Sequence, residues 1–289
     1  MRDRQEVSSV RVAAATITPS LDPSETRGRI RAIVEDTMHT WPDVRVIHFG
    51  EVILGWFAKK GQTADYHRSI AEPIPGPSTG FVADLARKHA VYISFGLTER
   101  AGEALYNTQV LVSPEGNIVA THRKFRTVIR VFTPGPEVLT TVKVDGLKIA
   151  LLVCADVRSL RILRAIRKEK VDLVLAALAD HGEDSAMSKM IGAFFDAWAM
   201  TANRFGGEDS IQWHGLTTIT DRWGRLVRSS IGRETVLVQD IPLAQTAPAG
   251  RQLRRMLVFF KSLALVISLS SRALWTHLKA DRRTTSKSR

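Results

Sequence analysis

Short apolar runs alternate with amphipathic segments along most of the chain, and this alternation restricts the fold more than any other feature of the sequence. Runs rich in Val, Ile, Leu and Ala, with the length of buried strands, cover residues 10–17, 44–51, 91–99 and 171–178. Residues 24–41 and 78–90 repeat apolar positions at the helical period, and each starts beside a Ser, Thr or Asp that can cap a helix. Strands that alternate with helices in this way predict an α/β protein.

Hairpin patterns show that crossover helices do not join all of the strands. Residues 105–124 contain a Pro-Glu-Gly-Asn turn between two alternating runs, residues 140–156 contain an Asp-Gly turn, and residues 215–230 repeat the pattern. Crossover and hairpin strands together predict a mixed sheet, or two such sheets packed on each other. Between them, apolar side chains at helical spacing predict one helix over residues 185–205, with Gly206 as its stop.

Positive charge is concentrated at the end of the sequence. The chain has 41 Lys and Arg against 29 Asp and Glu, a net charge of +12. Ten of the basic residues and one acidic residue lie in residues 250–289, so the rest of the chain is nearly neutral. A basic groove over the whole protein is not indicated, and nucleic acid is not an expected partner. The stretch PLAQTAPAG, residues 242–250, resembles a linker, so we expect a folded domain over residues 1–245 and a tail over residues 246–289.

The tail has the pattern of an added basic amphipathic helix. Residues 256–269 are apolar except for Lys261 and two serines, which is shorter than the about 20 residues that a spanning helix needs. Basic clusters on both sides favour contact of residues 251–279 with an anionic membrane surface. Packing of this helix on the body of the protein, or on a second subunit, is the alternative.

The cysteine count and the first residues bear on the compartment. One cysteine cannot form an internal disulfide, so nothing requires an oxidising environment. The N-terminal residues mix acidic and basic side chains and lack the apolar core of an export signal. A cytoplasmic protein is expected, with membrane association only through the tail. The eight histidines are scattered and have no second cysteine as partner, so no metal is expected.

Three residues with chemical potential follow strand-like runs. Glu51 ends the run 44–51, Lys124 ends the second hairpin strand, and Cys154 follows the apolar run 149–153. Singly, each has an ordinary interpretation: a solvated acid, a surface charge and a small core side chain. Together they form a chemical set, because Glu51 can take the proton of a thiol while Lys124 stabilises an oxyanion. This set predicts covalent acyl transfer through Cys154.

The order Glu51, Lys124, Cys154 resembles the Glu-Lys-Cys triad of the carbon–nitrogen hydrolase (nitrilase) superfamily. The flanking segments resemble it too: GEVILGW around the glutamate, YNTQVLVSPEGNIVATHRK up to the lysine, CADVR at the cysteine, and GLTTITDRWGRLV near the end. The resemblance covers residues 8 to 243 in the same order. It implies a four-layer αββα sandwich, a homodimer or higher homo-oligomer, and no cofactor or metal.

The resemblance also implies roles. Glu51 would be the general base, Lys124 the oxyanion partner and Cys154 the nucleophile at a sharp strand-to-helix turn, exposed to a pocket, with the amide of Ala155 as a further donor. The Cys-x-Asp-x-Arg pattern of CADVR resembles the amidase and carbamoylase branches. It therefore implies hydrolysis of a small-molecule linear amide or N-carbamoyl substrate through an acyl-enzyme.

The chain departs from the family pattern around the pocket. Many members carry a second glutamate a few residues after the lysine, where this sequence has only Arg126 and Arg130. Arg130 could attract an anionic substrate group, while Asp180 and His181, in a segment without the usual tryptophan or proline, could shape specificity. Solvated loop residues are the ordinary interpretation of Asp180 and His181.

Two other functions stay open at this point. The tail favours a membrane-associated N-acyltransferase that uses the same triad with an amine as acceptor. The missing glutamate favours a catalytically inactive binding or scaffold subunit. Loss of turnover in Cys154→Ala would separate the two enzymes from the scaffold.

Overall fold

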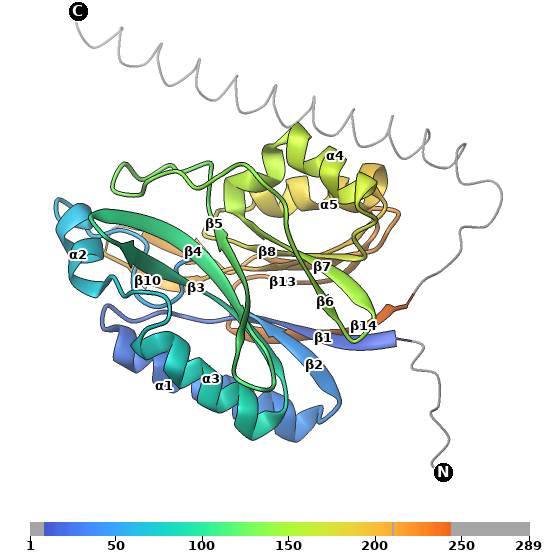
Figure 1. The fold of residues 1–289 in the computed structure, drawn as a ribbon, viewed down its shortest axis with the longest axis horizontal. Coiled ribbons are helices and arrows are strands. Elements are labelled where there is room, and N and C mark those ends of the chain that lie inside the picture. Colours follow the sequence, from blue (N-terminus) through green and yellow to red (C-terminus); the bar gives the residue numbers. More distant parts are fainter. Residues whose placement is uncertain (1–8, 210, 244–289) are drawn as a thin grey trace, which may run out of the picture. The chain divides into compact units, whose positions relative to one another are not determined.

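The computed structural model describes residues 9–209 and 211–243, and its core is built on two six-stranded sheets (Figure 1). The first sheet has the order β14-β1-β2-β3-β4-β5. Its strands are β1 (Ser9–Thr16), β2 (Val44–His48), β3 (Tyr92–Ala101), β4 (Ala104–Val112), β5 (Ile118–Arg123) and β14 (Thr235–Pro242). Helices α1 (Pro23–Thr40) and α3 (Pro77–His89) lie on its outer face.

The second sheet has the order β13-β12-β9-β8-β7-β6. Its strands are β6 (Thr140–Val144), β7 (Leu147–Val153), β8 (Leu173–Ala177), β9 (Trp198–Ala202), β12 (Thr217–Thr220) and β13 (Leu226–Ser230). Helices α4 (Leu160–Lys168) and α5 (Glu183–Phe195) cover it, and the 3-10 turn η1 (Cys154–Arg158) joins β7 to α4. A short helix α2 (Thr63–Ile70) and a two-stranded sheet of β10 (Phe205–Glu208) and β11 (Ile211–His214) complete the described elements.

The two sheets and the helices outside them form four layers, with an apolar layer between each neighbouring pair. Strand β7 contributes side chains to two of these apolar layers. Its residues Ile149 and Leu151 pack between the two sheets, against side chains of the first sheet such as Val12. The alternate residues Ala150 and Leu152 face the opposite way and pack under the helices α4 and α5. Successive side chains of a strand point to opposite faces, so a strand that is buried on both faces reads as an unbroken apolar run.

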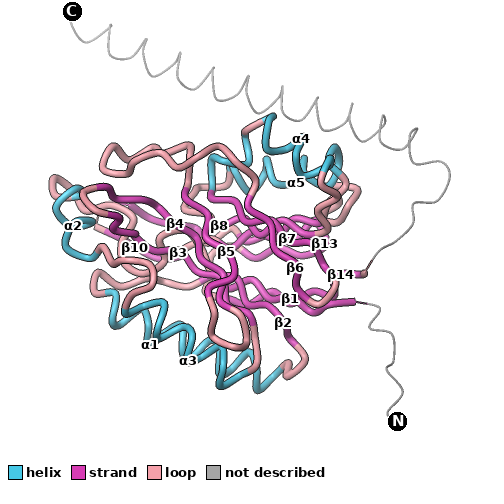
Figure 2. Tube along the Cα trace, in the orientation of Figure 1, coloured by secondary structure: helices cyan, strands magenta, loops and turns pink. Residues whose placement is uncertain are grey.

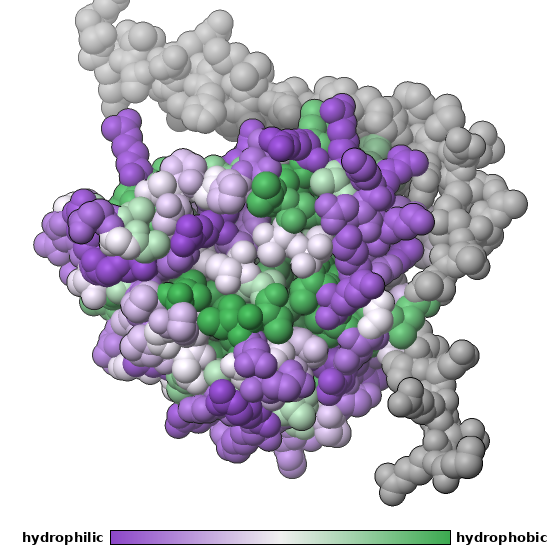
Figure 3. All heavy atoms as spheres, viewed as in Figure 1, coloured by the Kyte–Doolittle hydropathy of each residue, from purple (hydrophilic) through white to green (hydrophobic). Residues whose placement is uncertain are grey.

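The expected four-layer αββα sandwich is therefore confirmed for the described residues, and Figure 2 shows the helices outside the strand layers. On the face in view, hydrophilic side chains cover most of the helical layers and apolar ones gather in the middle, where sheet edges lie (Figure 3). None of the described helices is long and apolar enough to cross a membrane. The boundary at residue 245 and the amphipathic tail helix lie outside the described residues.

The single helix expected over residues 185–205 is wrong. Helix α5 ends at Phe195, where Asp196 takes a left-handed conformation with φ 62°, and β9 follows at Trp198. β9 pairs in parallel with β8 and antiparallel with β12. The apolar spacing of this segment fits a helix as well as a buried strand, and pairing with two neighbouring strands decides for the strand.

Sheet topology brings several strand ends to one region. β2 and β3 are parallel. β4 is antiparallel to both β3 and β5, so β5 runs in the same direction as β2 and β3. In the second sheet, β7, β8 and β9 are parallel to one another. The backbone N–H of Glu51, just after β2, donates to the carbonyl of Leu178, just after β8, at 3.3 Å. The carboxyl ends of both sheets therefore meet, which is where ligands bind in open α/β sheets.

Gly96 in β3 gives a direct test of the packing beneath the Glu51 loop. A Cβ at this position would lie 2.8 Å from the carbonyl oxygen of Gly50 and closer still to the amide nitrogen of Val52. We expect Gly96→Ala to lower the free energy of unfolding by about 1–3 kcal/mol, because the backbone must move to make room. Urea unfolding measures the change.

The matched control is Gly80→Ala on helix α3, where no atom lies within 4 Å of the added Cβ. This substitution is expected to raise the stability by up to about 1 kcal/mol, because alanine restricts the unfolded chain and favours the helix. Equal urea midpoints for the two variants would contradict the crowding at Gly96.

Candidate active site

A buried ion pair joins the ends of β2 and β5. The Nζ atom of Lys124 lies 2.5 Å from Oε1 of Glu51, and both side chains are at most 1% exposed. Asn107 of β4 donates from Nδ2 to the same oxygen at 2.6 Å. The other oxygen, Oε2, is buried and has no hydrogen-bond partner among the described residues. One oxygen of the carboxylate is thus fixed, and the second can accept a proton.

The charge of Lys124 is stable in this setting. Burial alone lowers the pKa of a lysine, because it disfavours the charged form. The negative charges of Glu51, first, and of Cys154 and Asp156 together outweigh that effect, so the pKa of Lys124 is raised. The setting therefore favours the ammonium form of Lys124.

Cys154 is the first residue of η1, directly after β7. Its φ of 47° lies in the left-handed region, which residues other than glycine rarely adopt. The expected sharp strand-to-helix turn is present, and 7% of the side chain is exposed. Its exposure to a pocket stays a prediction. The Sγ atom lies 2.9 Å from Oδ2 of Asp184 and 4.0 Å from the carbonyl oxygen of Ala179.

The surroundings of Cys154 keep the thiol protonated. Burial raises its pKa well above the usual value, and the Glu51 carboxylate raises it further. The Lys124 ammonium acts in the opposite direction, and Asp184 adds to the rise. A thiol in this state needs a base to become a nucleophile, and Glu51 is near enough for its charge to act on the sulfur.

Asp156, two residues after the cysteine, fixes η1 against the first sheet. Its Oδ2 lies 3.0 Å from Nε2 of His122 on β5, and its Oδ1 accepts from the backbone N–H of Arg126 at 2.9 Å. Both partners flank Lys124 in the chain. Asp156 therefore holds the nucleophile turn and the lysine segment together, a role that the Cys-x-Asp-x-Arg pattern alone did not reveal.

Asp180 and His181 lie in the segment just before α5, which begins at Glu183. Asp180 is buried, its Oδ2 accepts from the backbone N–H groups of Asp184 and Ser185 at 2.6 and 3.2 Å, and its Oδ1 accepts from Asn203. It therefore satisfies two backbone N–H groups of the first turn of the helix, whose N-cap residue is Gly182. Burial raises its pKa to about 6. The ring of His181 stacks on Trp213, with centroids 5.1 Å apart.

Two other predicted site residues are less buried than those above. Arg130 is exposed, in the loop between β5 and β6, and Ala155 is half-buried, directly after Cys154. Roles for Arg130 in anion binding and for the Ala155 amide as a donor to an oxyanion stay predictions, as do the roles of Asp180 and His181 in specificity.

Arg204 is a buried residue beside the Glu51 loop that the sequence did not single out. Its guanidinium is fully buried and pairs with Glu208 at 2.5 Å. It also donates to the backbone carbonyls of Glu51, Val52 and Gly55 at 3.0, 3.1 and 2.7 Å. Arg204 therefore fixes the loop that carries Glu51. The sequence around Arg204 gave no sign of this contact, because it joins residues about 150 positions apart in the chain.

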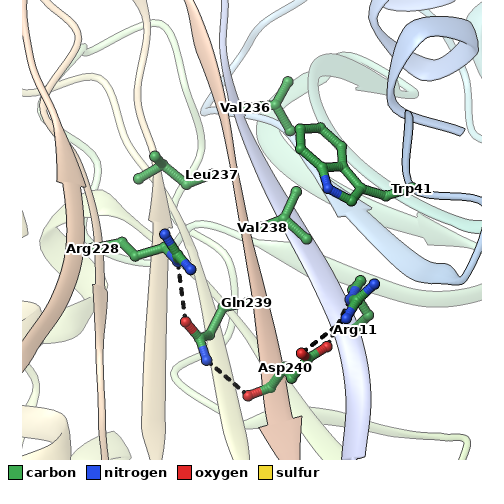
Figure 4. A pocket seen from close by; sticks show the side chains of 8 residues that line it. All are labelled: Arg11, Trp41, Arg228, Val236, Leu237, Val238, Gln239 and Asp240. Carbon is green, nitrogen blue, oxygen red and sulfur yellow. Dashed lines mark hydrogen bonds and ion pairs between the residues drawn. The ribbon is translucent and has the colours of Figure 1, made fainter. Parts of the chain in front are cut away.

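The remaining described residues offer no second reactive centre of this kind. They contain no group of three or more His, Cys, Asp or Glu that could hold a metal ion. A hollow beside β14 is lined by Arg11, Trp41, Arg228 and residues 236–240 (Figure 4). There Arg11 pairs with Asp240 at 2.7 Å, and Arg228 donates to Gln239, so its polar groups mainly satisfy one another.

Comparison with known proteins assigns the family. The carbon–nitrogen hydrolase model matches residues 11–251. An (R)-stereoselective amidase of Pseudomonas sp is 27% identical over 217 residues, 72% of this chain and 77% of that protein. An omega-amidase of Danio rerio is 22% identical over 269 residues, 86% of this chain and 93% of that protein. The crystal structure of an amidase from Nesterenkonia sp. superposes with a TM-score of 0.70 at 18% identity, over 86% of this chain and 96% of that chain.

The chain belongs to the carbon–nitrogen hydrolase family, in the nitrilase superfamily. Its class is that of the amidase-like enzymes, hydrolases of C–N bonds other than peptide bonds.

Proposed function

We propose that this enzyme hydrolyses a linear amide or an N-carbamoyl compound through a thioester on Cys154, with Glu51 as general base and Lys124 as oxyanion partner. The observation that carries the proposal is the state of Glu51. One of its oxygens is fixed by Lys124 and Asn107, and the other is buried without a partner among the described residues. A buried, unpaired carboxylate oxygen costs stability, and a catalytic role is a reason for a protein to keep one.

Acylation follows from these positions. Glu51 takes the thiol proton while Sγ of Cys154 forms a bond to the carbonyl carbon of the substrate. The negative charge that develops on the carbonyl oxygen is stabilised by the Lys124 ammonium and by the amide of Ala155. The C–N bond then breaks, the leaving nitrogen takes the proton from Glu51, and the acyl group remains on sulfur.

Deacylation reuses the same groups. Glu51 takes a proton from water as the water oxygen attacks the thioester carbon, and Lys124 again stabilises the oxyanion. The C–S bond breaks, the acid leaves, and the proton on Glu51 returns to the thiolate. Both steps balance without a cofactor.

Amides are favoured over nitriles by the Cys-x-Asp-x-Arg pattern and by similarity to two amidases. The acyl-transfer alternative differs only in the acceptor. A homodimer or larger assembly, and contact of residues 251–279 with an anionic membrane, stay predictions that light scattering and vesicle sedimentation can check.

The proposal predicts that the protein converts a short linear amide to its acid with release of one ammonia per acid. With hydroxylamine present, a hydroxamate should form as well, because the thioester reacts with any good nucleophile. Ammonia assay and mass spectrometry of the products measure both. The control is the same protein treated with iodoacetamide, since it has a single cysteine.

Alkylated protein should give neither product. Ammonia release that survives alkylation would contradict the thioester. A product formed only with an added amine, never with water, would identify the enzyme as an acyltransferase instead.

A further inference from the structure

Two carboxylates act electrostatically on the Cys154 thiol, and each is paired with a cation. Glu51 pairs with Lys124. The Cys154 thiol itself donates to Oδ2 of Asp184 at 2.9 Å, and Arg158 donates from Nε to Oδ1 of Asp184 at 2.5 Å. The sequence drew attention to the first pair only. The second pair makes the direct hydrogen bond to the thiol in the free enzyme.

Asp184 is a fixed acceptor. Its side chain is 2% exposed, and it lies in the first turn of α5, where its backbone N–H donates to Asp180 and its carbonyl accepts from Ser188. Arg158 ends the turn η1 that Cys154 begins. The thiol and its acceptor are therefore joined both directly and through Arg158.

This geometry gives the two carboxylates different tasks. The thiol proton points to Asp184, while Oε2 of Glu51 is buried with no partner among the described residues. Before Glu51 can take that proton, the Cys154 side chain must turn away from Asp184. The hydrogen bond to Asp184 therefore holds a resting orientation of the thiol, not the attacking one.

The charges around the sulfur come from four elements. Glu51 follows β2 and Lys124 follows β5, while Arg158 lies on η1 and Asp184 on α5. Burial, Glu51 and Asp184 favour the neutral thiol, and Lys124 favours the thiolate. If the charge of Asp184 is removed, Glu51 is the remaining carboxylate of these four residues that opposes ionisation of Cys154. The thiol should then ionise at a lower pH.

We propose that Asp184 is a positioning residue that fixes the Cys154 thiol in a protonated resting orientation, and that Arg158 holds Asp184 in place for this purpose. The inference rests on the proposed role of Cys154 as nucleophile. Substrate that enters the site replaces the contact between the thiol and Asp184, so the nucleophile ionises beside the carbonyl that it attacks.

The test is the rate of Cys154 alkylation by iodoacetamide against pH, in wild type and in Asp184→Asn. Asparagine keeps the size of the side chain and can still accept from the thiol, but it removes the charge. We expect the pH profile to move down by about one unit, so that the rate at pH 7 rises about tenfold. The matched control is Glu183→Gln, the same charge change at the exposed neighbouring residue, which should change the rate less than about twofold.

A second variant covers the case in which Asp184→Asn does not fold. Arg158→Gln removes the cation that balances Asp184, so alkylation at pH 7 should fall several-fold. A profile of Asp184→Asn that matches wild type, or faster alkylation of Arg158→Gln, would overturn the proposal. Neither result depends on amide turnover. A wild type without turnover but with the expected shifts would refute the proposed function alone.

Discussion

Cys154→Ala is expected to lower kcat/KM by at least about 10⁴-fold for any amide that the wild type hydrolyses. The reaction proposed here forms its covalent intermediate on Sγ, and no other described side chain can replace a thiol at that position. Losses of this size accompany removal of the nucleophile in enzymes that work through an acyl intermediate. Steady-state kinetics with the amide identified by ammonia release measures the change.

The fold should survive this substitution. Alanine is smaller than cysteine and keeps the backbone of η1, so only the contacts of Sγ with Asp184 and Ala179 are lost. A melting temperature within roughly 5 °C of wild type is expected, which corresponds to about 1–2 kcal/mol for a chain of this size. A folded Cys154→Ala variant that keeps a tenth of the wild-type activity would refute Cys154 as nucleophile, and with it both the amidase and the acyltransferase mechanism that use this triad.

Much of this arrangement could be predicted because it depends on where strands end. Glu51 and Lys124 follow strands of the first sheet, and Cys154 follows a strand of the second. Since the carboxyl ends of parallel strands lie at one edge of a sheet, local apolar patterns were sufficient to place polar residues at that edge. The order of the three residues then indicated the family, and the family model over residues 11–251 agrees.

The contacts that position these residues could not be predicted in the same way. Asp184 meets Cys154 only because α5 packs beside η1, and the sequence around Asp184 is that of any acidic first turn of a helix. The division of residues 185–205 into α5 and β9 failed for a related reason. Pairing of β9 with β8 and β12 is a long-range interaction, and the spacing of apolar residues within the segment carries no record of it.

Arg204→Met is expected to lower the free energy of unfolding by about 3–5 kcal/mol, the largest loss of stability among the substitutions considered. Glu208 would be left buried without its cation, and breaking one half of a buried ion pair costs this much. Thermal or urea unfolding measures it. The matched control is Arg228→Met on β13, where the arginine is exposed and donates to Gln239. This change should stay within about 0.5 kcal/mol.

The double variant Arg204→Met/Glu208→Leu separates two effects of Arg204: its contribution to stability through the ion pair and its contribution to the position of the Glu51 loop. An apolar pair of similar volume can replace a buried ion pair with little loss of stability, so the double variant should regain most of what Arg204→Met loses. It should not regain activity, because the carbonyls of Glu51, Val52 and Gly55 still lack the donor that fixes them. We expect kcat/KM at least about tenfold below wild type in a protein of near-normal stability. Recovery of both properties would show that Arg204 serves folding alone, and that Glu51 keeps its position without it.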